Sequence, residues 1–146
     1  MKNLEQIRAR NALAFASSND PVVNSSGGEV VKKLPALIMG HGLLAAGAFA
    51  YQKQHDDRRK GRNNGFYLCF NAIARHLSDP EIHIVRISGK PSQQFTLEDL
   101  LEYLTNAQSH SGLLKSATSE ALAWLSYARR FVKKPTTQNQ SEFEDE

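Results

Sequence analysis

The sequence predicts an all-α protein, a compact single-domain bundle of about five or six helices around a central apolar helix. Residues 34–51, LPALIMGHGLLAAGAFAY, form the one long apolar run, and segments with apolar residues at helical spacing flank it. Residues 81–87, EIHIVRI, alternate like a strand, but no second strand-like run is present to pair with them. The length of 146 residues suits one domain, which we expect to span residues 1–134.

The first helix is expected over residues 3–16, because Leu4, Ile7 and Leu13 recur at roughly helical spacing between polar residues. Residues 17–30 are rich in Ser, Asn, Pro and Gly, a composition typical of loops. We therefore expect a flexible loop between the first helix and the apolar run.

The apolar run predicts the central helix, over about residues 34–53. Pro35 lies in its first turn, where the missing N–H costs little, and apolar residues surround its axis on a helical wheel. Gly40 and Gly47 fall on one side, where they would let a neighbouring backbone approach. The glycines and the central His41 make the run a poor membrane span. We expect His41 to be a hydrogen-bonded histidine of the core or of an interface.

A charged connector, residues 55–65, follows the central helix. Apolar residues at helical spacing from Phe66 to Leu77 predict a third helix, which stops before Pro80. Without a partner strand, residues 81–87 should be irregular.

Thr96 followed by Asp99 resembles a capping box and predicts a helix over residues 97–108. The last helix is expected over residues 112–133, because Pro135 cannot continue it.

The charge of the chain is unevenly distributed. It has 18 Lys and Arg residues against 15 Asp and Glu residues, a net charge of +3. The last five residues, EFEDE, hold four of the acids, so residues 1–141 carry a net charge of +7. A cationic body favours a polyanionic partner, nucleic acid first and an acidic membrane surface second. Residues 135–146 have almost nothing to bury and should form a disordered acidic tail.

Basic side chains gather on the last helix. On a helical wheel Trp124 and Leu125 fall on the core face, the basic residues fall on the solvent side, and Glu120 lies at the edge of that side. The basic residues of this stripe are Lys115, Arg129, Arg130, Lys133 and Lys134. Such a stripe either binds phosphates and releases their counterions, or complements the helix dipole by about 0.3–1 kcal/mol for each cation. The sequence leaves both interpretations open.

A second basic cluster lies in the charged connector and consists of Arg58, Arg59, Lys60 and Arg62. Asp56 and Asp57 come directly before it and lower its specificity for phosphate. We regard it as the second candidate for contact with nucleic acid.

No pattern predicts a catalytic residue, a metal site or a cofactor. Cys69 and His76 would lie about 10 Å apart along a helix, too far to share one ion. Glu98 and Glu102 lie one turn apart, but acids in the first turns of a helix usually complement its dipole. The single cysteine excludes an intramolecular disulfide, and the first residues lack an apolar signal-peptide core. We therefore expect a reducing, cytoplasmic setting.

Three stretches in this order and spacing resemble one family. They are LEQIRARNALAF at residues 4–15, KLPALIMGHGLLAAGAFAYQK at residues 33–53 and SATSEALAWLSYARRFVKK at residues 116–134, about 50 residues of the 146. Together they resemble the small subunit of the type III-B CRISPR effector, the fifth protein of the Cmr complex.

The resemblance implies a compact all-helical protein without catalytic residues that serves antiviral defence. It implies stacking with further copies of the chain, head to tail, in a minor filament beside the crRNA and its target RNA. The other partners it implies are the remaining Cmr subunits, which cut the target, and it implies no membrane. With the wheel, it makes the following residues candidates for contact with RNA: Lys53, Arg58, Arg59, Lys60, Arg62, Lys115, Arg129, Arg130, Lys133 and Lys134.

The alternative hypothesis is a stand-alone DNA-binding regulator of the helix-turn-helix type. Residues 96–122, TLEDLLEYLTNAQSHSGLLKSATSEAL, would supply its two helices. That motif has a turn of about three or four residues, and NAQSHSG is longer than this. The Cmr hypothesis is therefore the first of the two.

Overall fold

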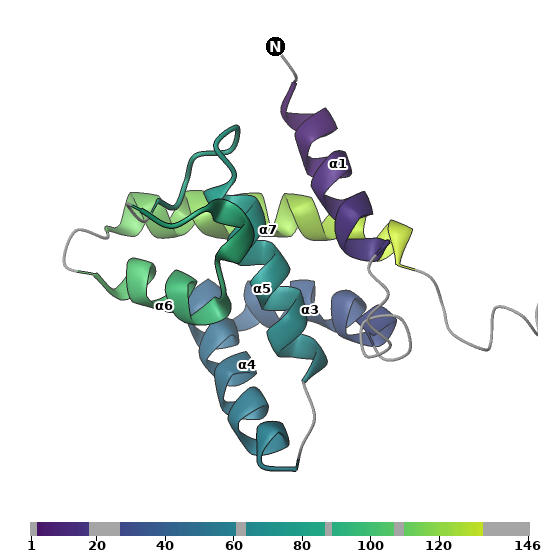
Figure 1. Ribbon diagram of the computed structural model, residues 1–146, viewed down its shortest axis with the longest axis vertical. Helices are drawn as coiled ribbons and strands as arrows, with labels where there is room; N and C mark the ends of the chain where they lie inside the picture. The colour runs from purple at the N-terminus through teal and green to yellow at the C-terminus, as the bar shows by residue number, and fades with distance from the viewer. Residues whose placement is uncertain (1–2, 18–26, 61–63, 87–88, 107–109, 133–146) are drawn as a thin grey trace, which may run out of the picture.

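The computed structural model describes residues 3–17, 27–60, 64–86, 89–106 and 110–132. Within these residues the chain forms six α-helices and one 3-10 turn, without a strand (Figure 1). The all-α class is therefore confirmed. The elements are α1 (Leu4–Ala16), α3 (Gly27–His41), α4 (Leu43–Arg58), α5 (Gly65–Ser78), η1 (Ser92–Gln94), α6 (Leu97–Thr105) and α7 (Ser111–Phe131).

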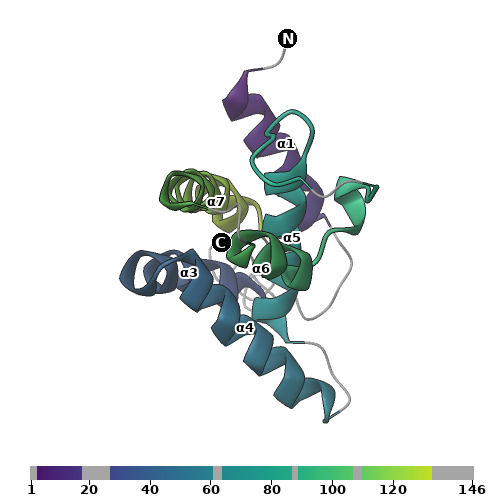
Figure 2. The same ribbon diagram turned by 90° about the vertical axis from the view of Figure 1, so that its left-hand side faces the viewer.

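Helix α5 is the central apolar helix of the bundle. It contacts α1, α3, α4, α6, α7 and η1, and ten of its 14 residues are buried. Phe70, Ile73 and Leu77 are fully enclosed and form the middle of the core. The long α7 crosses α5, while α4 and α6 pack on its other sides (Figures 1 and 2). The position at the centre belongs to α5 because most of its residues are buried against the surrounding helices, while Arg75 remains exposed.

The prediction of one helix over residues 34–53 is wrong. The chain turns at Gly42, whose φ of 92° and ψ of 161° separate α3 from α4, and Figure 2 shows α4 running away from the end of α3. Only glycine adopts this conformation without strain. The Gly42 N–H still bonds to the Ile38 carbonyl at 2.7 Å, and its carbonyl accepts from Ala46 N–H at 3.0 Å. One residue thus ends one helix and begins the next.

The turn at Gly42 changes the surroundings of the residues beside it. His41 is exposed and therefore not a core histidine, while its place in an interface stays a prediction. Met39 is 74 % exposed. Gly40 and Gly47 no longer share one side: nothing lies within 4 Å of a Cβ built on Gly40, whereas Gly47 is buried beneath Leu101 of α6. The wheel failed here because it assumes that the axis is continuous.

Helix α3 begins earlier than predicted. Residues 27–30 were expected in a loop but form its first turn, while residues 18–26 lie outside the described residues. Val30, Leu34 and Ile38 follow each other at a spacing of four and are all buried, together with Val31. This burial extends the helix through a glycine-rich start, because tertiary packing outweighs local propensity.

The remaining elements follow the sequence more closely. The predicted capping box is present: the Thr96 hydroxyl accepts from the Asp99 N–H, and the Asp99 carboxylate accepts from the Thr96 N–H. Helix α6 ends at Thr105, three residues before its predicted end at 108. Residues 81–86 form no strand, as expected, but Val85 is buried and its N–H bonds to the Leu77 carbonyl at 3.0 Å.

The two glycines predict opposite responses to substitution. Gly47→Leu should destabilise the fold by about 1–3 kcal/mol, because even a Cβ at this position would lie 3.1 Å from Leu101 Cδ2 and 3.4 Å from Leu97 Cδ1. Gly40→Ala should stabilise it by up to about 1 kcal/mol, because the helix gains propensity without a contact. Urea denaturation of both variants measures the difference in the free energy of unfolding. Destabilisation by Gly40→Ala would contradict the open space beside Gly40.

Candidate nucleic-acid interface

The C-terminal end of α7 carries two exposed arginines, Arg129 and Arg130, which we call the α7 basic end. Neither makes a hydrogen bond or ion pair with another described residue. On the opposite side of the same turns, Trp124, Leu125 and Ala128 are buried. The core face predicted from the wheel is therefore confirmed, and it holds the two guanidinium groups toward solvent.

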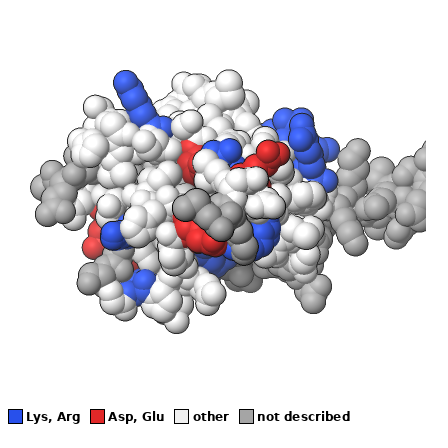
Figure 3. Space-filling model, turned by 90° about the horizontal axis from the view of Figure 1, so that it is seen from above, with Lys and Arg blue, Asp and Glu red and all other residues white. Residues whose placement is uncertain are grey.

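Four other basic side chains of the described residues pair with an acid. These pairs are Arg8 with Glu120, Arg10 with Asp79 and Glu81, Lys33 with Glu29, and Lys90 with Asp99. Figure 3 accordingly shows blue side chains in separate places on the upper face, with red ones between them. Cations paired with acids attract phosphate weakly, so these four are poorer candidates for phosphate contact than Arg129 and Arg130.

The predicted stripe along α7 is not brought together as a whole. Lys115 is exposed at the beginning of the helix, about 21 Å from Arg129 along the axis at 1.5 Å per residue. It borders a groove whose other lining residues include Leu44 and Leu122. Lys133 and Lys134 lie outside the described residues.

The second cluster forms a separate surface at the end of α4, which we call the α4 basic end. It consists of Lys53, Arg58, Arg59 and Lys60, all exposed, while Arg62 lies outside the described residues. The Lys53 Nζ lies 5.7 Å from the centre of the Phe49 ring, a cation–π contact. In Figure 1 the end of α4 points away from α7. The two basic ends are therefore distinct surfaces.

The structure reveals a buried ionic network that the sequence did not indicate. Glu120, 6 % exposed, accepts from Arg8 Nε and Nη2, both at 2.8 Å, and contacts His76 Nε2 at 2.9 Å. The wheel had placed Glu120 at the edge of the solvent side. That placement is wrong because α1 packs over this part of α7. The partners of Glu120 lie 112 and 44 residues away in the sequence, so no local pattern could find them.

Hydrogen bonds fix the tautomer of His76. The Asn11 Nδ2 donates to Asp79 Oδ2 at 3.0 Å and lies 2.9 Å from His76 Nδ1. A carboxylate only accepts, so the amide nitrogen of Asn11 faces both groups and His76 Nδ1 accepts. The His76 Nε2–H then donates to Glu120. Burial alone would raise the pKa of Glu120, but the hydrogen bonds from Arg8 and His76 outweigh it and lower this pKa to about 2.

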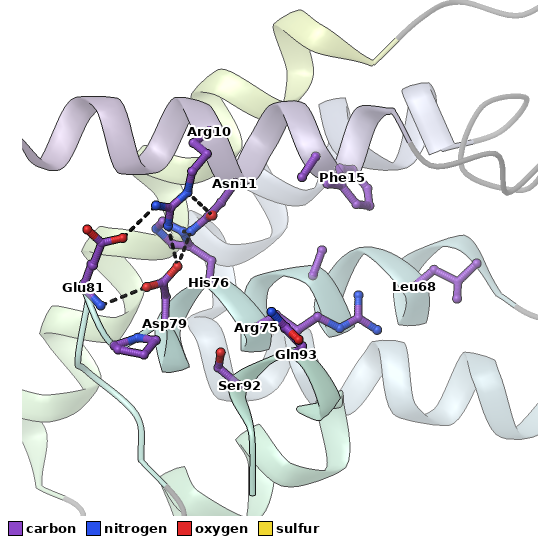
Figure 4. A pocket seen from close by; sticks show the side chains of 13 residues that line it. Arg10, Asn11, Phe15, Leu68, Arg75, His76, Asp79, Glu81, Ser92 and Gln93 are labelled. Carbon is purple, nitrogen blue, oxygen red and sulfur yellow. Dashed lines mark hydrogen bonds and ion pairs between the residues drawn. The ribbon is translucent and has the colours of Figure 1, made fainter. Parts of the chain in front are cut away.

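A pocket of about 780 Å³ lies beside this network, between α1, α5 and the segments at residues 79–81 and 92–93. We call it the α1–α5 pocket (Figure 4). Its polar side chains come from elements far apart in the sequence, so it exists only because α1 is held against α5 and α7.

The described residues contain no group of three or more His, Cys, Asp or Glu side chains that could hold a metal ion. Cys69 is buried, and burial raises the pKa of its thiol. In the part of the chain that the structure describes, no helix is long and apolar enough to cross a membrane.

Comparison with known families decides between the two hypotheses from the sequence. The family model of the CRISPR-associated protein Cas_Cmr5 matches residues 4–134. This chain belongs to the Cmr5 family. As a Cmr5-family protein it is a subunit of a type III-B CRISPR complex, and the helix-turn-helix regulator is not favoured. The comparisons with curated proteins and with solved structures found no match.

Glu120 predicts a characteristic response of stability to pH. Its folded-state pKa of about 2 lies below the ordinary 4.5, so its contribution is fully present above about pH 4.5 and is lost as the pH falls toward 2. At neutral pH Glu120→Gln should cost about 1.5–3 kcal/mol, because Arg8 loses an ionic hydrogen bond. Urea denaturation between pH 7 and 3 should show a weaker pH dependence for the variant. Glu102→Gln, at an exposed position, is the control, and equal effects of both would contradict the network.

Proposed function

We propose that this Cmr5-family protein is a non-catalytic structural subunit that stacks with further copies along the crRNA and target RNA and contacts their phosphates through the α7 basic end. The observation that carries this proposal is the pair of exposed arginines, Arg129 and Arg130, without an acidic partner among the described residues. The partners are the other Cmr subunits, further copies of this chain, crRNA and target RNA, in the cytoplasm.

The α7 basic end is a better phosphate-binding surface than the α4 basic end for two reasons. Its arginines follow directly on the buried Trp124 and Ala128, so the backbone that presents them is fixed in the core. The α4 basic end, in contrast, has Asp56 and Asp57 in its own last turn, and like charges repel the phosphates. Contacts to phosphate carry no base identity, which suits a complex that reads its target through the guide RNA.

A non-catalytic role is supported by what the candidate reactive side chains do. Glu98 accepts hydrogen bonds from the Tyr67 hydroxyl at 2.8 and 3.0 Å. Burial, together with this contact, raises the pKa of Tyr67 to about 12. His76 is 2 % exposed and donates to Glu120. Glu98 and His76 therefore already serve contacts between helices, which supports a structural role for them.

Two exposed apolar surfaces support stacking through a heterologous contact. Leu4 and Leu13 of α1 are 43 % and 53 % exposed. A groove of about 460 Å³ lies on a different part of the molecule, where the turn between α3 and α4 meets α7, and Leu44 and Leu122 are among its lining residues. Two unlike apolar surfaces can join copies head to tail, and such a contact continues as a filament where a two-fold contact would close.

The RNA contact predicts a change in salt dependence. Replacing Arg129 and Arg130 together by Gln should flatten the slope of log retention of RNA against log salt by about 1.4–1.8 units, because each phosphate contact releases about one counterion. Target retention by the assembled complex, measured across a salt series, tests this. The matched control is the double change Arg58→Gln and Arg59→Gln, which should leave the slope unchanged. Equal slopes for wild type and the α7 variant would show that the α7 basic end does not contact RNA.

The stacking contact predicts weak association of the free protein. Transient interfaces bury less surface than obligate ones, so sedimentation of the dilute protein should show monomers. Leu13→Glu should lower the number of copies in the assembled complex, measured by native mass spectrometry, with little loss of fold stability because Leu13 is half exposed. Gln52→Glu, exposed on α4, adds the same charge as a control. A tight two-fold dimer would contradict this contact.

A further inference from the structure

Arg75 is a cation without a partner at the wall of the α1–α5 pocket. Its guanidinium makes no hydrogen bond or ion pair with any described residue. The side chain reaches solvent through the pocket, yet burial among the surrounding atoms lowers the pKa of Arg75. An exposed guanidinium that lines a pocket and pairs with no acid among the described residues is a site at which an anion would be stabilised.

The two charged sides of the pocket differ in what they offer a ligand. On one side Arg10 pairs with Asp79 at 2.8 Å and with Glu81 at 2.7 Å, so both acids are already engaged. Figure 4 shows these three side chains joined by dashed lines, while Arg75 lies apart from them next to Gln93. An anion is therefore attracted to the Arg75 side and repelled from the side that holds the two carboxylates.

The surroundings of Arg75 suit a planar body with polar edges. Phe15 of α1 is half-buried, and Leu68 and Ala72 of α5 line the same pocket. Ser92 and Gln93 of η1 contribute a hydroxyl and an amide, which both donate and accept hydrogen bonds. The volume of about 780 Å³ lies within the range of ordinary small-ligand sites, roughly 300–1,000 Å³.

We propose that the α1–α5 pocket binds one nucleoside 5′-monophosphate unit, with its phosphate on Arg75, its base against Phe15 and Leu68, and the base edge facing Gln93. The guanidinium fork matches phosphate oxygens in pairs, and bases stack on aromatic side chains in sites that accept single-stranded nucleic acid. An acidic peptide would use Arg75 but would leave the apolar wall and the amide of Gln93 without a matching group.

The same unit has two sources, a free mononucleotide or one nucleotide of an RNA strand. The second source rests on the proposed contact with RNA. In that case the pocket would be a second RNA-contacting site, separate from the α7 basic end. Binding of a free mononucleotide does not depend on assembly of the complex, so the pocket and the proposed function can fail separately.

The experiment measures binding to the full-length free protein by NMR titration of backbone amides. The probes are uridine 5′-monophosphate, uridine, inorganic phosphate and a glutamate-rich peptide. Uridine 5′-monophosphate should shift the amides around Ala72, Arg75 and Gln93, and uridine and phosphate should bind at least about tenfold more weakly, since each lacks one of the two recognised groups. Arg75→Gln should weaken binding of the nucleotide about tenfold, and Lys32→Gln, which removes an exposed positive charge of α3, should have no effect.

A short single-stranded RNA of ~10 nucleotides and an abasic strand with the same number of phosphates then distinguish the sources. Preference for the RNA over the abasic strand, lost in Arg75→Gln, assigns the pocket to a nucleotide of a strand; binding of the mononucleotide alone assigns it to the free ligand. Three results would overturn the proposal: inorganic phosphate or the peptide binding as well as the nucleotide, an unchanged affinity in Arg75→Gln, or shifts confined to residues outside the pocket. Thermal melting checks that the variants remain folded.

Discussion

The buried carboxylate of Glu120 is the constraint on which the arrangement of the helices depends. An ionised group cannot stay out of water without partners, and Glu120 obtains them from two other helices, Arg8 of α1 and His76 of α5. The three-way contact fixes the rotation of α1 against α7, because a bidentate arginine tolerates little misalignment. Together with the buried Ile7, Ala12 and Ala16, this pairing holds α1 in the place where it helps to build the α1–α5 pocket.

Holding α1 in this place has consequences on both of its sides. Toward the core, Phe15 packs its ring 5.4 Å from that of Trp124, which anchors the C-terminal half of α7. That anchoring keeps Arg129 and Arg130 at a fixed place on the surface. Toward solvent, Leu13 stays exposed because Ile7, Ala12 and Ala16 take the buried positions of α1. The proposed surface for RNA and the proposed surface for another copy of the chain thus both depend on the position of α1.

The turn at Gly42 is the second constraint, and it separates surfaces that one straight helix would have joined. A continuous helix over residues 34–53 would have kept Gly40 and Gly47 on one side and the α4 basic end in line with α3. The turn instead buries Gly47 beneath α6, exposes Met39 and sends the end of α4 away from α7. The match to the Cmr5 family covers residues 4–134. Both Gly42 and Glu120 therefore lie inside the region that matches the family.

The sequence by itself determined the all-α class, most of the helices and the core face of α7, because these depend on periodicity and on caps such as Thr96 that act within a few residues. It also determined the family, through three stretches recognised by order and spacing. Only the tertiary structure decided that α5 is central, that Glu120 is buried and that Arg75 pairs with no acid among the described residues. Those properties depend on side chains that lie dozens of residues apart until the helices pack, and a helical wheel contains no information on which helix covers which face.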